Sequence, residues 1–71
     1  MILEWDSFLV GGTTSHIGHT NTFSMIYHEQ NNELVIRRRG GLVVVREFCT
    51  DFPSARRLAQ HIEDELGGRD V

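Results

Sequence analysis

The chain has 71 residues, of which 39% are hydrophobic and 24% are charged, and its formal net charge is −3. This length allows one domain with one modest core, so we expect marginal stability and a homodimer. The composition excludes a disordered chain and is too mixed for a membrane-spanning segment. The acidic balance argues against general attraction to nucleic acid, which leaves only a local basic patch for that role.

The N-terminal six residues contain two acids and no basic residue, so they do not form a signal peptide and a cytoplasmic location is expected. Cys49 is the single cysteine. It excludes an internal disulfide and fits a reducing compartment.

Alternating apolar and polar residues predict a first strand over 2–10 and a second over 22–29. Between them, residues 11–21 are rich in glycine and hydroxyl side chains, which favour turns, so this segment is predicted to be a flexible loop. The dipeptides Asn31-Asn32 and Gly40-Gly41 suit positive φ and predict two-residue turns on either side of a further strand.

These turns set a testable register, because directly opposed residues of a hairpin share a face. Counting outward from them pairs Tyr27 with Ile36, Met25 with Arg38, Ile36 with Val45 and Arg38 with Val43. One face of the sheet then collects the apolar side chains Phe23, Met25, Tyr27, Leu34, Ile36, Val43, Val45 and Cys49. Slipping either turn by one residue would scatter this set, so its coherence supports an antiparallel meander.

A C-terminal helix is predicted to begin at Asp51, which can accept from free backbone N–H groups, with Pro53 in the first turn. Its apolar stripe comprises Phe52, Ala55, Leu58, Ala59, Ile62 and Leu66. Gly67 and Gly68 are expected to end it with positive φ, and residues 67–71 to form a disordered tail. The predicted fold is therefore a single α+β domain over residues 1–71, a three- to four-stranded antiparallel β-meander with the helix packed on one face.

The other face of the sheet is mixed rather than polar, and it divides the arginine triplet 37–39 because neighbouring strand residues point to opposite faces. Arg38 is predicted to point toward the helix side. The candidate binding surface on the other face comprises Arg37, Arg39, Arg46, Val44, Phe48, Ile26 and His28. Arginine and aromatic residues without lysine are typical of a protein interface, so we expect a non-enzymatic module for protein binding or self-association.

The alternative is a DNA-binding regulator in which Arg37, Arg39 and Arg46 contact phosphates or guanine edges. The order of elements over 22–66, with Phe52-Pro53-Ser54-Ala55 at the helix start, resembles AP2 and integrase amino-terminal domains. That resemblance implies an exposed sheet docked on DNA. Those families have a far more basic sheet, whereas this one alternates arginine with aliphatic residues, which favours a protein partner.

Three further groups of residues resemble functional sites less closely. His16-x-x-His19 has a spacing compatible with a metal, yet structural zinc sites usually take four ligands, so loop histidines are expected instead. Gly11-Gly12-Thr13-Thr14-Ser15 lacks the lysine of a phosphate-binding loop. Cys49 falls on the core face and is expected to be a buried hydrophobe. We therefore predict no catalytic residue, no metal site and no cofactor.

Overall fold

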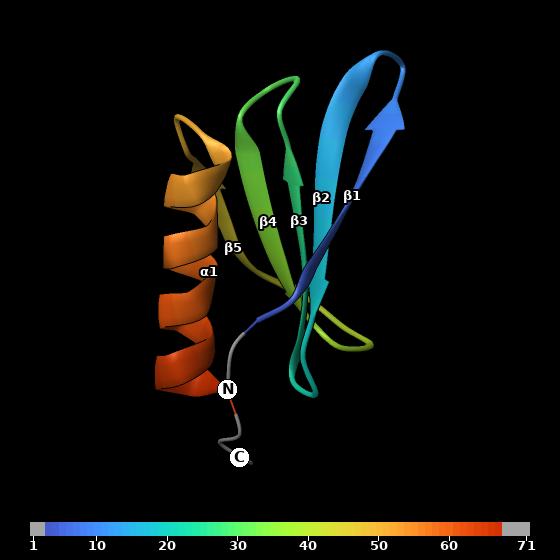
Figure 1. The fold of residues 1–71 in the computed structure, drawn as a ribbon. Helices are drawn as coiled ribbons and strands as arrows, with labels where there is room; N and C mark the ends of the chain where they lie inside the picture. The colour runs from blue at the N-terminus through green and yellow to red at the C-terminus, as the bar shows by residue number, and fades with distance from the viewer. Residues whose placement is uncertain (1–2, 68–71) are drawn as a thin grey trace.

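The computed structural model describes residues 3–67, which form a single antiparallel sheet followed by one helix (Figure 1). The strands are β1 (Trp5–Val10), β2 (Thr13–His19), β3 (Phe23–His28), β4 (Glu33–Arg38) and β5 (Val43–Phe48), and the helix is α1 (Phe52–Leu66). The strands are ordered β1-β2-β3-β4-β5, so each one pairs with its neighbour in the sequence. The α+β meander with a C-terminal helix is confirmed, with five strands rather than three or four.

The additional strand is β2, which occupies the segment predicted to be a flexible loop over 11–21. That prediction was wrong because only the turn of the hairpin needs glycine: Gly11 and Gly12 have φ of 59° and 82°, and the strand begins directly after them. The residues that follow pair along their whole length with β1 on one side and β3 on the other. Thr13, Thr14 and Ile17 favour a strand, and the pairing on both sides accommodates the small and polar residues between them.

The register between β3 and β4 differs from the prediction by two residues. Tyr27 lies opposite Leu34, and Met25 lies opposite Ile36, because the connection is a four-residue turn over 29–32. Asn32 adopts the positive φ expected there, at 55°. A register shift of two residues leaves every side chain on the same face of the sheet. The predicted apolar residues of β3 and β4 therefore still share one face, although each predicted β3–β4 pair is wrong.

A β-bulge interrupts the pairing of β4 with β5. Ile36 lies opposite Val45 as predicted, but the next pair is Arg37 with Val43, so Val44 is an extra residue on β5. A bulge of this kind changes the side-chain alternation of the strand that contains it. Val43 was predicted to belong to the core face opposite Arg38. It instead lies opposite Arg37 and is exposed, and it must be removed from the core set.

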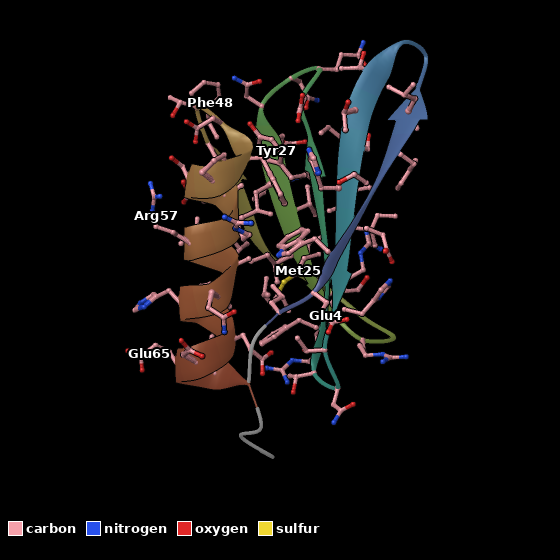
Figure 2. All side chains as sticks on the ribbon, viewed as in Figure 1. Glu4, Met25, Tyr27, Phe48, Arg57 and Glu65 are labelled. Carbon is pink, nitrogen blue, oxygen red and sulfur yellow. The ribbon has the colours of Figure 1, made fainter. Side chains whose placement is uncertain are left out.

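The core lies between α1 and the sheet face formed by alternate residues of β3 and β4. Figure 2 shows Met25 and Tyr27 projecting into this layer. The largest fully buried side chains are Tyr27, Phe23, Met25, Leu34 and Ile36. Ala55 and Ala59 are buried on the helix, where small side chains let it approach the sheet closely, and Phe52, Leu58 and Ile62 pack beside them. Leu66, predicted to be part of the same stripe, is exposed.

A local signal in the sequence explains where α1 begins. Asp51 caps the helix by accepting a hydrogen bond from the backbone N–H of Ser54 at 2.9 Å, and this bond lowers the pKa of the Asp51 carboxyl. Gly67 ends the helix, but its φ is −69° rather than positive, and its N–H bonds to the Glu63 carbonyl. The predicted tail over 67–71 lies, apart from Gly67, outside the described residues.

Tyr27 connects the core to the segment that leads from β5 into α1. Its hydroxyl donates to the Cys49 carbonyl at 2.8 Å, and the Cys49 N–H donates to the Asn32 carbonyl at 2.8 Å. Burial raises the pKa of both the Tyr27 hydroxyl and the Cys49 thiol.

We therefore expect Tyr27→Phe to lower the free energy of unfolding by about 1–2 kcal/mol, because the buried Cys49 carbonyl loses its donor while the ring packing is kept. Urea denaturation of both proteins at the same chain concentration measures this. An unchanged midpoint would contradict a contribution of this hydrogen bond to stability.

No helix within residues 3–67 is long and apolar enough to cross a membrane.

Candidate functional site

The sheet face opposite α1 has no further layer over it in the described part of the chain (Figure 1), and we refer to it as the open face. The strand registers place its side chains in rows that run across the sheet. One row comprises Asp6, Ile17, Ile26, Val35 and Arg46. A neighbouring row comprises Phe8, Ser15, His28, Glu33 and Phe48. The open face is therefore mixed in character, with an aliphatic centre and charged or aromatic margins.

The three arginines predicted to line this face do not form one basic patch. Arg46 donates to the Glu33 carboxylate at 3.2 Å, so its charge is compensated within the sheet. Arg39 was predicted to be a strand residue, but β4 ends one residue before it. Its guanidinium donates to the Thr20 carbonyl at 3.2 Å. Arg37 lies on the open face between Ser24 and Val43. Among residues 3–67, it is the arginine with no hydrogen bond, ion pair or aromatic contact.

Arg38 points toward the helix side, as predicted. Its guanidinium carbon lies 5.7 Å from the centre of the Phe23 ring, and Phe23 is also its partner across β3 and β4. The charged head thus covers the margin of the core while the ring beneath it is buried.

Exposed apolar side chains gather on β5 and the turn before it. Leu42 is 82% exposed, Val44 is 43% exposed and Phe48 is 69% exposed, and Val43 lies among them. We call Leu42, Val43, Val44 and Phe48 the β5 patch. Because β5 is the last strand of the sheet, its outer backbone groups have no strand partner within residues 3–67.

A second exposed apolar segment lies at the opposite edge of the sheet. Phe8, Leu9 and Val10 form the end of β1 and are all exposed. The sheet order separates this segment from β5 by three strands. The two predicted residues Ile26 and His28 lie between the edges, on β3, and are only partly exposed.

The two histidines considered as metal ligands lie on opposite faces of β2, because three residues along a strand reverse the direction of the side chain. His16 is buried on the helix side, whereas His19 is exposed opposite Ser24. They therefore cannot bind one ion together. Within residues 3–67, no three side chains of the metal-binding types converge.

Sequence reasoning missed the surroundings of His16. This residue is only 7% exposed, and its ring stacks on Phe52 with centroids 3.7 Å apart and an interplanar angle of 7°. Its Nδ1 lies 2.6 Å from the Ser7 hydroxyl, and its Nε2 lies 2.6 Å from the Glu29 carboxylate. No sequence motif joins these three residues, because pairing of β1, β2 and β3 is what brings them together.

A shallow hollow of about 310 Å³ lies beside this cluster, at the start of α1. Glu29 and Phe52 form part of its wall together with Tyr27, Asn32, Thr50, Asp51 and Pro53. Solvent in the hollow therefore reaches the Glu29 side chain, which is 44% exposed, although His16 is covered.

Comparison of the chain with protein-family models, curated proteins and solved structures found no significant match.

Proposed function

We propose that the protein is a binding module that associates with a second copy of itself through the β5 patch and the adjoining part of the open face. The observation that supports this most directly is the exposure of Val44 and Phe48 on an edge strand and of Leu42 directly before it. Leu42, Val43 and Val44 are consecutive exposed residues, and contiguous exposed apolar surface usually marks an interaction site.

Two further features favour protein over nucleic acid as the partner. The β5 patch adjoins Arg37 and Arg46, and arginine beside aromatic and aliphatic side chains is typical of protein interfaces. Of the three candidate arginines, Arg46 is paired with the Glu33 carboxylate, and the Arg39 guanidinium already donates to the Thr20 carbonyl, which leaves fewer free donors for a phosphate backbone. A 71-residue chain also buries a small core, so pairing would add stability.

Val44→Asp tests the proposal, with Val10→Asp as its matched control. Both valines are about half exposed on edge strands, 43% and 54%, but they lie on opposite edges of the sheet. We expect sedimentation at micromolar concentration to show a dimer for the natural protein and for Val10→Asp. We expect Val44→Asp to be monomeric and to retain its circular dichroism spectrum.

A natural chain that sediments only as an 8.1 kDa species would contradict self-association. A dimer lost in Val10→Asp but kept in Val44→Asp would move the interface to β1. Unfolding of Val44→Asp would mean that Val44 belongs to the core. Binding of duplex DNA at low salt that weakens in Arg37→Ala would instead support the nucleic-acid alternative.

A further inference from the structure

Three side chains on the helix side of the sheet are connected in a hydrogen-bonded chain: Ser7 to His16, and His16 to Glu29. Both connecting distances, from Ser7 Oγ to His16 Nδ1 and from His16 Nε2 to Glu29 Oε2, are 2.6 Å. Ser7 and His16 are directly opposed on β1 and β2. Glu29 follows β3, where its N–H bonds to the Thr14 carbonyl and so extends the β2–β3 pairing. The backbone of three adjacent strands therefore determines the order serine, histidine, carboxylate.

The partners determine the proton positions in this chain. A carboxylate has no hydrogen to donate, so His16 Nε2 carries the proton that bonds to Glu29. In a neutral imidazole the other nitrogen, Nδ1, is then an acceptor, and the Ser7 hydroxyl donates to it. This is the proton arrangement that serine nucleophiles require: a base that accepts from the hydroxyl, and a carboxylate that orients the base and stabilises its protonated form.

The imidazole is held in place by ring packing. His16 stacks on Phe52 and lies 6.1 Å from the Tyr27 ring, and Phe52 has the Arg56 guanidinium 5.6 Å from its centre. Ser7, in contrast, is exposed. The arrangement combines a fixed, water-excluded base with an accessible hydroxyl, which lowers the reorganisation needed for proton transfer.

We propose that Ser7 is an acyl-accepting nucleophile for small esters with apolar groups, with His16 as general base and Glu29 as the positioning residue. In this step Ser7 Oγ forms a bond to the ester carbonyl carbon while its proton passes to His16 Nδ1. The bond from that carbon to the leaving oxygen breaks, and the leaving alcohol takes the proton from Nδ1. The acyl group remains on Ser7, and no oxidant, metal or cofactor is consumed.

The surroundings of Ser7 favour an apolar substrate of this class. Trp5 and Leu9 lie two residues before and after Ser7 and so share its side of β1, with Leu9 exposed. Within residues 3–67, β1 is an edge strand of the sheet, so a substrate can approach it from the side that has no neighbouring strand. This reactivity goes beyond the proposed binding function and uses the opposite edge of the sheet from the β5 patch.

A second serine–histidine pair in the same sheet provides an internal control for the reactivity of Ser7. Ser15 and His28 also form a serine–histidine contact, at 3.1 Å, but Ser15 is 3% exposed, and within residues 3–67 His28 has no hydrogen bond to a carboxylate. His28 could act as a base for Ser15, but a substrate cannot reach the Ser15 hydroxyl and no carboxylate of the described residues orients the His28 ring. Ser15 should therefore not react.

To test this, the natural protein is incubated with p-nitrophenyl butyrate. Absorbance measures the release of nitrophenolate, and peptide mapping by mass spectrometry locates the butyryl group. We expect one butyryl group on Ser7. Ser7→Ala should lose this adduct, and Ser15→Ala should keep it. No acyl group on Ser7, or equal labelling of Ser7 and Ser15, would overturn the proposal.

Glu29→Gln separates reactivity from folding, because Glu29 is half exposed and its loss should leave the fold intact. An amide can donate to His16 Nε2 and so favour the tautomer with the proton on Nδ1, which no longer accepts from Ser7. We expect acylation of Ser7 to slow by about tenfold to a hundredfold. The ¹⁵N chemical shifts of His16 should report the change of tautomer. An unchanged acylation rate in folded Glu29→Gln would contradict the positioning role.

Discussion

Phe23→Ala is expected to lower the free energy of unfolding by about 3–5 kcal/mol, because it removes a fully buried ring and leaves a cavity between β3 and α1. Phe23 is 0% exposed and belongs to the core cluster. Its loss also leaves the Arg38 guanidinium without the ring beneath it. Small domains have a stability of roughly 0.05–0.15 kcal/mol per residue, so a change of this size is a large fraction of the stability expected for this chain.

Phe48→Ala is the matched control, because it makes the same chemical change at a side chain that is 69% exposed at the end of β5. We expect it to change the stability of the isolated chain by less than about 1 kcal/mol. Urea denaturation at two chain concentrations measures both effects, because a contribution of Phe48 to self-association appears as concentration dependence. Similar losses for the two variants at low concentration would contradict the assignment of one ring to the core and the other to the surface.

Gly18→Val is expected to lower the free energy of unfolding by about 1–3 kcal/mol, the usual cost of adding volume to a well-packed site. Gly18 is directly opposed to Trp5 across β1 and β2. A Cβ atom at this position would lie 3.2 Å from two carbons of the indole ring, so the ring must move. Trp5 also contacts the Phe52 ring edge-on at 5.2 Å, and Phe52 stacks on His16, so the displacement reaches the base of the proposed nucleophile.

Fluorescence of Trp5, the single tryptophan, should report its movement as a shift to longer wavelength in the folded state. Gly41→Val is the control, because a Cβ atom there would meet only the Arg38 carbonyl oxygen at 3.9 Å. We expect the control to change stability by no more than about 0.5 kcal/mol. An unshifted emission maximum in Gly18→Val would contradict the packing of the indole over this glycine.

The fold class was predictable because it depends on local and repeating signals. Alternation over β3, β4 and β5 placed Phe23, Met25 and Tyr27 on one face, and the helix stripe supplied Ala55 and Ala59 to cover them. A strand period of two residues explains why this set survived an error of two residues in the β3–β4 register. The capping role of Asp51 was predictable for the same reason, since it involves residues only three apart.

The errors occurred where the structure depends on neighbouring strands. Residues 13–19 were predicted to form a loop because of their glycine and hydroxyl residues, yet Thr13, Thr14 and Ile17 favour strands, and the segment forms β2 because β1 and β3 pair with both of its edges. The bulge at Val44 adds one residue to β5, which moved Val43 from the predicted core face to the surface. Arg39 lies one residue beyond the end of β4 rather than on the strand, where its guanidinium donates to the Thr20 carbonyl.

The amino-acid sequence by itself determined the elements whose signals are local: the α+β class, the C-terminal helix with its cap, and the apolar face of β3 and β4. It also separated Arg38 from Arg37, because alternation along a strand needs no partner. Only the tertiary structure decided which polar side chains of different strands meet. Ser7, His16 and Glu29 are nine and thirteen residues apart, and strand pairing alone places them within hydrogen-bonding distance. The charge of Arg46 is likewise compensated by a residue of the neighbouring strand, since contacts across a sheet follow register rather than sequence spacing.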